Sequence, residues 1–426
     1  MTDNNQLMPF DFSGDETPSI IKVIGVGGGG GNAVNHMYKE GIHGVTFALC
    51  NTDNQALAKS PIPVKLQLGP TITHGLGAGN NPPKAKDAAE ESIEDIKHLL
   101  SDGTQMVFIT AGMGGGTGTG AAPVVARVAK EMNILTVGIV TIPFLFEGKE
   151  KIIQAIEGVE QIKQNVDALM IINNERLRSI YSDLTFINAF TKADDTLSIA
   201  AKSIVEIITE QGIMNLDFAD VSTTLRNGGV AIISTGLGDG DNRVEKAIQD
   251  ALHSPLLNNT DIVNAQKVLI NLTFSESANF MMDEVGAIHD FMKKLNPNVK
   301  VIWGYATDNS LDTSVKITLL ASGFDVKDFA GEEITDEIED AKQKKITDVY
   351  GADLISGIQR ARAKKRHLYI FSPEDLDNDD IISMVEMSPT YQRDKATLDT
   401  ICSKAVVETE AFEEDASDEN SRIITF

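Results

Sequence analysis

Short apolar runs alternate with amphipathic stretches along the first three quarters of the chain. The apolar runs are rich in Val and Ile, as strands are, and the stretches between them, such as 84–100, repeat apolar residues at the spacing of a helix. Five of these runs begin at Ser19, Gly44, Gln105, Ile134 and Val166. The alternation predicts an α/β fold with a largely parallel, Rossmann-like sheet covered by helices on both faces. Ligands of such sheets bind at the carboxyl ends of the strands.

A long amphipathic helix is predicted between this group of elements and a second, smaller group. Its periodicity is clearest over Ala193–Gly212, where a glycine closes the helix. Four further strands and two helices are predicted between 228 and 323, which gives a smaller α/β domain that ends near Phe324. The predicted organisation is an N-terminal arm at 1–19, a ligand-binding domain at 20–187, the central helix at 188–212, the smaller domain at 213–324 and a tail at 325–426.

The tail differs from the rest of the chain in composition. The chain has a net charge of −25, and roughly half of that charge falls after residue 325. Acidic blocks flank one short basic run at 359–367, so we predict a mostly disordered acidic tail with short interaction segments. A chain this acidic is not expected to bind nucleic acid through the phosphates.

The cysteines and the apolar segments indicate a compartment. Cys50 and Cys402 are far apart in the sequence, which predicts no disulfide framework and favours a reducing cytosol. The polar, acidic start does not read as a signal peptide, and the longest apolar run, from Ile134, is too short to span a bilayer. We therefore expect a cytoplasmic protein without direct membrane insertion.

Two junctions between a strand and a helix are rich in glycine, "GVGGGGGNAV" at 25–34 and "GGGTGTG" at 114–120. Glycine lets backbone N–H groups approach an anion closely, and the start of a helix adds a favourable dipole. A merely tight turn needs one or two glycines, whereas the second junction has five in seven residues. The second loop is therefore predicted to hold phosphate.

The first loop alone is ambiguous. Gly25, Gly27 and Gly30 satisfy the dinucleotide-binding pattern, and Asp53 falls where such a fold keeps its ribose-binding acid. An NAD-dependent oxidoreductase is thus a real competitor. However, a third loop, "HGLGAGNNP" at 74–82, also has the composition of an anion-binding loop. Three such loops suit a nucleoside triphosphate better, and the P-loop pattern does not occur.

At this point several motifs carry a resemblance. "GGGTGTG" is the signature of the tubulin/FtsZ GTPases, and "GVGGGGGNAV", "NTDNQAL", "GLGAGNNP", "AAPVVARVAKE", "FEGK" and "MNLDFADV" follow the family's order over about residues 20–324. The chain is most similar to the bacterial cell-division members. The resemblance implies a GTPase that binds GTP or GDP with Mg²⁺, forms a head-to-tail homopolymer and builds the division ring at midcell.

The resemblance also implies roles for individual residues around the nucleotide. The phosphates would be held by Gly28, Gly29, Gly30, Gly31, Asn32, Gly115, Gly116, Thr117, Gly118, Thr119 and Gly120, with Ala78, Gly79 and Asn80 near the γ-phosphate. The ribose would be held by Glu147 and Lys151. Lys151 stands where the family usually has arginine, so the charge is kept and the bidentate fork is lost.

Three residues would recognise guanine in the same way: Asn174, Phe190 and Asp194. Phe190 would stack on the ring, and Asp194 would accept hydrogen bonds from N1–H and the amino group, which adenine cannot donate. On spacing alone, the segment "NAFTKADD" is better explained as a solvated helix start with acidic caps. The family's Pro-Asn before this asparagine is replaced here by Asn173-Asn174.

An acidic pair marks the expected catalytic loop, "NLDFADV". Asp217 and Asp220 are three residues apart at a helix start, so both can share one face. They either cap the helix or polarise a water for attack on a γ-phosphate. In the family this loop, which includes Asn215, reaches the nucleotide of the next subunit, and such a head-to-tail contact builds a filament. A non-catalytic scaffold is the alternative that this pair argues against.

Two tail segments are candidate docking peptides. Family members end in a short peptide that binds membrane-tethering adaptor proteins, and Pro389, Tyr391 and Arg393 in "MSPTYQRDK" resemble it, with Gln392 in place of the usual leucine. The apolar terminal "RIITF" is the second candidate, and chance patches in a disordered tail are the alternative.

Overall fold

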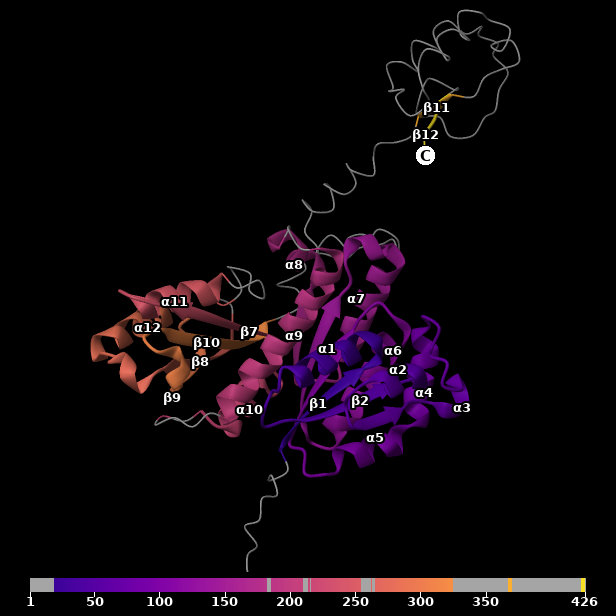
Figure 1. Cartoon of the computed structure of the whole chain (residues 1–426), viewed down its shortest axis with the longest axis horizontal. Helices are drawn as coiled ribbons and strands as arrows, with labels where there is room; N and C mark the ends of the chain where they lie inside the picture. Colours follow the sequence, from indigo (N-terminus) through magenta and orange to yellow (C-terminus); the bar gives the residue numbers. More distant parts are fainter. Residues whose placement is uncertain are drawn as a thin grey trace, which may run out of the picture. The chain divides into compact units, whose positions relative to one another are not determined.

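The structure, a computed structural model, describes residues 19–181, 185–209, 214, 216–253, 262, 265–324, 367–369 and 423–425. Strands β1 to β10 form one mixed sheet in the order β3-β2-β1-β4-β5-β6-β7-β10-β8-β9 (Figure 1). The predicted fold class, an α/β protein with a mostly parallel sheet, is confirmed.

The first six strands pair in parallel: β1 (Ile21–Val26), β2 (Thr46–Asn51), β3 (Val64–Gln67), β4 (Met106–Gly112), β5 (Leu135–Ile142) and β6 (Ala168–Asn173). All of β1 is buried, because helices cover both faces of a parallel sheet. Strand β3 was not predicted from the sequence; it is a short edge strand that is exposed in its first half.

The helices of this part follow the strands: α1 (Gly27–Lys39), α2 (Asn54–Lys59), α3 (Pro70–Thr73), α4 (Pro82–Glu91), α5 (Ile93–Leu100), α6 (Gly116–Glu131), η1 (Leu145–Glu147), α7 (Lys149–Lys163) and α8 (Asn174–Ile180). The stretch 84–100, predicted as one helix, is two. Helix α4 ends before Ser92, whose Oγ accepts a hydrogen bond from the Gly69 N–H at 3.0 Å. Ser92 has φ −101° and ψ 19°, outside the helical region, so α4 ends and α5 begins at this residue.

The central helix, α9 (Phe186–Thr209), begins earlier than the predicted start at 188 or 193. It packs on α1 and the sheet through a buried stripe that includes Leu197, Ala201 and Ile204. Its first turn contains the apolar residues Phe186, Ile187 and Phe190, so the apolar pattern extends further towards the amino end than the predicted start allowed. Helix α10 (Phe218–Leu225) follows α9, and in Figure 1 it lies past the end of α9 opposite to α8.

The second group of elements completes the sheet: β7 (Gly229–Gly238), α11 (Arg243–Leu252), β8 (Lys267–Phe274), η3 (Glu276–Ala278), η4 (Met282–Glu284), α12 (Val285–Met292), β9 (Lys300–Thr307), η5 (Asn309–Leu311) and β10 (Val315–Phe324). Strand β10 pairs antiparallel with β7 and β8 along nearly its whole length, whereas β6 meets β7 through two residue pairs. This group has its own hydrophobic core.

Of the tail after residue 325, the structure describes only β11 (His367–Tyr369) and β12 (Ile423–Thr425), which pair antiparallel within a separate compact unit. The terminal "RIITF" thus contains a paired strand. The predicted peptide with Pro389, Tyr391 and Arg393 lies outside the described residues, as does the predicted N-terminal arm except for Ser19. None of the described helices combines the length and the apolar character that crossing a membrane would need.

Candidate functional site

The first glycine loop joins β1 to α1 and contains glycines of two kinds. A Cβ on Gly30 would lie 2.2 Å from the Thr110 carbonyl oxygen, and one on Gly25 would lie 2.5 Å from the Gly30 oxygen. These two glycines let α1 pack against the sheet. Gly28, by contrast, is exposed, and its missing side chain would meet nothing within 4 Å. The space beside Gly28 is therefore open to a ligand.

The second loop joins β4 to α6 and shows the same division. A Cβ on Gly118 or Gly120 would lie 2.4 Å or 2.1 Å from a backbone oxygen, and the Thr119 Oγ1 accepts a hydrogen bond from the Gly114 N–H at 2.9 Å. Gly118, Thr119 and Gly120 therefore stabilise the loop itself. Their contact with phosphate stays a prediction. Gly115, before the first residue of α6, has open space where its side chain would be.

The loops contact one another at the carboxyl ends of the strands. A Cβ on Gly27 would lie 2.8 Å from the Gly118 nitrogen, and one on Gly116 would lie 2.8 Å from the Asn81 nitrogen in the third loop. In that third loop Gly79 and Asn80 are exposed and have positive φ, while Ala78 is buried. The three loops predicted from the sequence thus meet in one place.

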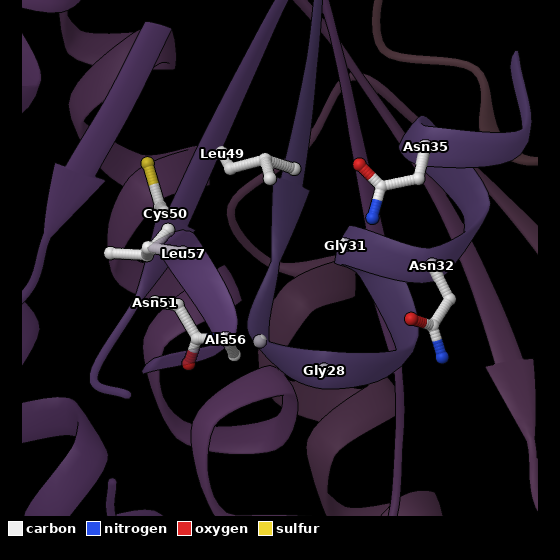
Figure 2. Close-up of a pocket in the computed structure, with 10 residues that line it drawn as sticks. Gly28, Gly31, Asn32, Asn35, Leu49, Cys50, Asn51, Ala56 and Leu57 are labelled. Carbon is white, nitrogen blue, oxygen red and sulfur yellow. The ribbon is translucent and has the colours of Figure 1, made fainter. Parts of the chain in front are cut away.

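A hollow of about 310 Å³, open to solvent, lies beside the first loop. Figure 2 shows Gly28, Gly31 and Asn32 from α1 lining it together with residues of β2 and α2. No side chain caps the amino end of α1 or of α6, so the first N–H groups of both helices are available to an anion. Burial raises the pKa of Cys50, which also lines the hollow, to about 12, and its thiol is therefore uncharged at neutral pH.

Glu147 and Lys151, the predicted ribose contacts, lie close together. The Glu147 Oε1 accepts a hydrogen bond from the Phe144 N–H at 2.9 Å, and its Oε2 lies 3.3 Å from the Lys151 Nζ. The backbone hydrogen bond orients the carboxylate. The ion pair places the single ammonium group of Lys151 beside this carboxylate, where an arginine would place a guanidinium group with two donors.

Phe190, near the start of α9, presents a partly exposed ring. Its centroid lies 5.1 Å from that of Phe144 in an edge-on arrangement, and Phe144 in turn stacks on Phe146. The aromatic cluster supports the ring from the protein side. A flat base could stack on the exposed part.

Asn174 is buried at the first residue of α8, and its Oδ1 has no hydrogen-bond partner in the described part of the chain. A buried polar atom left in this way costs about 1–3 kcal/mol, and a ligand donor would remove that cost. The neighbouring Asn173 accepts a hydrogen bond from the Glu175 N–H at 3.0 Å and caps α8. This cap gives a local reason for asparagine where the family usually has proline.

Asp194 lies one helical turn after Phe190, so both side chains share a face of α9. Burial raises the pKa of Asp194 to about 6; the nearby His36 opposes the shift, and Asp195 adds to it. The His36 Nε2 lies 2.7 Å from Asp195 Oδ1 and 3.3 Å from Glu40 Oε1. A half-buried carboxylate of this kind gains more from the two donors of guanine than an exposed one would.

The catalytic candidates begin α10. Asp217 is its N-cap, and its Oδ1 accepts hydrogen bonds from the N–H groups of Ala219 at 2.8 Å and Asp220 at 3.1 Å. The Asp220 Oδ2 accepts the Asp217 N–H at 3.2 Å, which completes a capping box. Both aspartates thus cap the helix. Asn215 lies outside the described residues.

The carboxylate pair, Asp217 and Asp220, is remote from the predicted base-binding residues on α9. The rise of an α-helix, about 1.5 Å per residue, separates Asp194 from Thr209 by roughly 22 Å along α9. Asp217 follows Thr209, the last residue of α9, in the chain. The predicted base-binding residues Phe190 and Asp194 thus lie near the start of α9, whereas the acidic pair begins α10, which Figure 1 shows past the other end of α9.

Loops of this kind, on a parallel sheet joined by a long helix to a second α/β unit, define a nucleotide-binding protein of tubulin-like architecture. Residues 20–182 match the GTPase domain of the Tubulin/FtsZ family, 229–325 match the FtsZ family C-terminal domain and 363–408 match the FtsZ C-terminal segment. The chain is 51% identical over 413 residues to the cell division protein FtsZ of Porphyromonas gingivalis, which covers 93% of this chain and 90% of that protein. It belongs to the FtsZ family of cell-division GTPases.

Solved structures agree with this assignment. The empty FtsZ dimer of M. jannaschii superposes with a TM-score of 0.66 at 41% identity, covering 73% of this chain and 90% of that chain. The GTPγS-bound CetZ2 protofilament of Haloferax volcanii, at 18% identity and a TM-score of 0.62, shares the fold; the match covers 78% of this chain and 99% of that one. The predicted family and GTPase activity are confirmed, and the oxidoreductase hypothesis is set aside.

Proposed function

We propose that this GTPase hydrolyses GTP at the contact between successive subunits of a head-to-tail filament, and that these filaments build the bacterial division ring at midcell. One observation carries the proposal: Phe190 and Asp194, the predicted base-binding residues, lie near the start of α9, and the acidic pair lies past its other end. A single subunit then brings a nucleotide at one end and a pair of carboxylates at the other. The complete site forms where two subunits meet.

The glycine loops are proposed to hold the phosphates through the first N–H groups of α1 and α6, where Gly28 and Gly115 leave room. Glu147 with Lys151 would bind the ribose, and Asn174, Phe190 and Asp194 the guanine. Mg²⁺, bound with the phosphates, would neutralise their charge.

The acidic pair is proposed to orient the attacking water. Capping uses Oδ1 of Asp217 and Oδ2 of Asp220. The other oxygen of each carboxylate is then directed to the water of the neighbouring subunit's site.

The proposal is tested by sedimenting the protein with GTP, GDP or NADH while phosphate release is followed. We expect polymer and phosphate with GTP, neither with NADH, and no phosphate with GDP. Phosphate release at the same rate per molecule at every protein concentration would show that one subunit holds the whole site.

We expect the affinity for GDP to depend on pH through the ionisation of Asp194. Only the carboxylate accepts both guanine donors, and its pKa of about 6 leaves it about one-tenth ionised at pH 5. Affinity for GDP should therefore be about tenfold lower at pH 5 than at pH 7, rising through pH 6 and then levelling off.

The control is Asp194→Asn, measured by the same titration calorimetry. His36, Asp195 and the nearby Lys192 keep their charges in this variant, so any pH dependence that they cause would persist. A flat profile assigns the effect to Asp194, and an unchanged profile would contradict the assignment.

The tail is proposed to attach filaments to the membrane through an adaptor protein. Tyr391 is the proposed anchor, because the terminal strand β12 already pairs with β11. We expect Tyr391→Ala to remove most binding to the purified adaptor, while deletion of 325–426 leaves GTP hydrolysis nearly unchanged. Loss of binding on removal of 422–426, with none from Tyr391→Ala, would move the docking site to the terminus.

A further inference from the structure

Helix α7 lies along the second glycine loop through one of its faces. A Cβ on Gly114 would lie 2.7 Å from the Lys151 carbonyl oxygen, and one on Gly158 would lie 2.5 Å from the Thr119 Cγ2. Between these two contacts, the Gln154 Nε2 donates a hydrogen bond to the Gly115 carbonyl oxygen at 2.9 Å. Positions 151, 154 and 158 share one face of a helix, so α7 touches the loop at three successive points.

Gly115 is the N-cap residue of α6, so its C=O also accepts the first hydrogen bond of the helix, and the bond from Gln154 is a second restraint on the orientation of this peptide unit. Gly115 has no side chain, has open space around its Cα and caps α6 without a side-chain hydrogen bond. In a trans peptide the C=O and the next N–H point in opposite directions. Because Gln154 holds the Gly115 C=O on the α7 side, the Gly116 N–H is directed away from α7.

We propose that Gln154 is a positioning residue for phosphate binding. It fixes the Gly115–Gly116 peptide so that the first N–H of α6 points at the anion, and this inference rests on the proposed function of the loop. Gln154 also lies one turn after Lys151, whose Nζ pairs with Glu147. The ribose-binding and phosphate-binding parts of the site are thus joined through one helix.

The test compares Gln154→Met and Gln154→Glu with the parent protein. Methionine keeps the length and packing of glutamine without a donor, and glutamate places a carboxylate oxygen against the Gly115 oxygen. The matched control is Gln161→Met, the same substitution at an exposed position of α7. Binding of GTP, GDP and guanosine is measured below the assembly concentration, since guanosine has no phosphate.

We expect Gln154→Met to lower the affinity for GTP and GDP about five- to tenfold, the effect of one lost hydrogen bond, and to leave that for guanosine unchanged. Gln154→Glu should lose at least as much, and Gln161→Met should match the parent. Unchanged affinities, or an equal loss for all three ligands, would overturn the inference. If the parent itself bound none of the three, the proposed function would fail instead.

Discussion

Asp220→Ala protein should bind GTP as tightly as the parent and hydrolyse it at least about a hundredfold more slowly. Loss of a group that orients the attacking water typically costs two to four orders of magnitude in rate, about 10²–10⁴. Binding should be unaffected, because Asp220 lies past the far end of α9 from Phe190 and Asp194, the proposed base-binding residues. Phosphate release and nucleotide binding are measured on the same preparation.

Asp220 also belongs to the capping box of α10, so the variant must be separated from a simple loss of the cap. Asp220→Asn keeps an oxygen that can accept the Asp217 N–H and should unfold at nearly the parent temperature. We expect it to hydrolyse GTP almost as slowly as Asp220→Ala. Normal turnover in Asp220→Asn would show that capping is the only role of this side chain.

A mixing experiment addresses the sharing of the site. In the proposed filament, each contact between subunits draws its carboxylates from one chain and its nucleotide from the other. Asp220→Ala subunits should therefore enter filaments with parent subunits and lower the turnover beyond simple dilution, because stable filaments trap parent subunits. Turnover strictly proportional to the parent fraction would argue against that trapping.

Gly28→Asp should lower GTP and GDP affinity at least about a hundredfold without unfolding the protein. Nothing lies within 4 Å of the position of its Cβ, so the backbone leaves open space where the side chain starts. Its carboxylate would occupy the place proposed for phosphate, where repulsion between like charges at about 4 Å is worth several kcal/mol at an effective dielectric of about 20. Equilibrium binding and thermal unfolding are the measurements.

Gly286→Asp is the matched control for Gly28→Asp. Both glycines are the second residue of a helix, and both have open space around them. An acidic residue at this position favours the helix dipole by about 0.3–1 kcal/mol, so neither variant should be less stable than the parent. Nucleotide binding should be lost only in Gly28→Asp, and equal losses would refute a phosphate site at the first loop.

The sequence predicted the sheet and the meeting of the glycine loops because both leave local patterns. Continuous apolar runs mark β1 and β4, and the loops follow directly from their ends. The edge strand β3 leaves no such pattern, since half of it is exposed. The break at Ser92 leaves none either, because the apolar spacing of 84–100 continues across the junction of α4 and α5.

At the site, the residue types could be predicted from the sequence. Which of these residues pack inside the protein and which leave space for a ligand could not. The glycine run alone does not tell Gly28, which has open space, from Gly30, which packs against Thr110. The part played by Gln154 was missed because a glutamine in the middle of an amphipathic helix looks like an ordinary surface residue. Only the packing of α7 on the loop brings it to Gly115.

The capping box of Asp217 and Asp220 has a consequence for the timing of hydrolysis. Both carboxylates are already held by backbone hydrogen bonds in the isolated chain, so the entropy lost in ordering them is lost when the chain folds. Immobilising two such side chains at an interface would otherwise cost about 0.5–1.5 kcal/mol each. In the proposed filament, a joining subunit brings an acid pair that is already ordered, and the first turnover should follow contact without a lag.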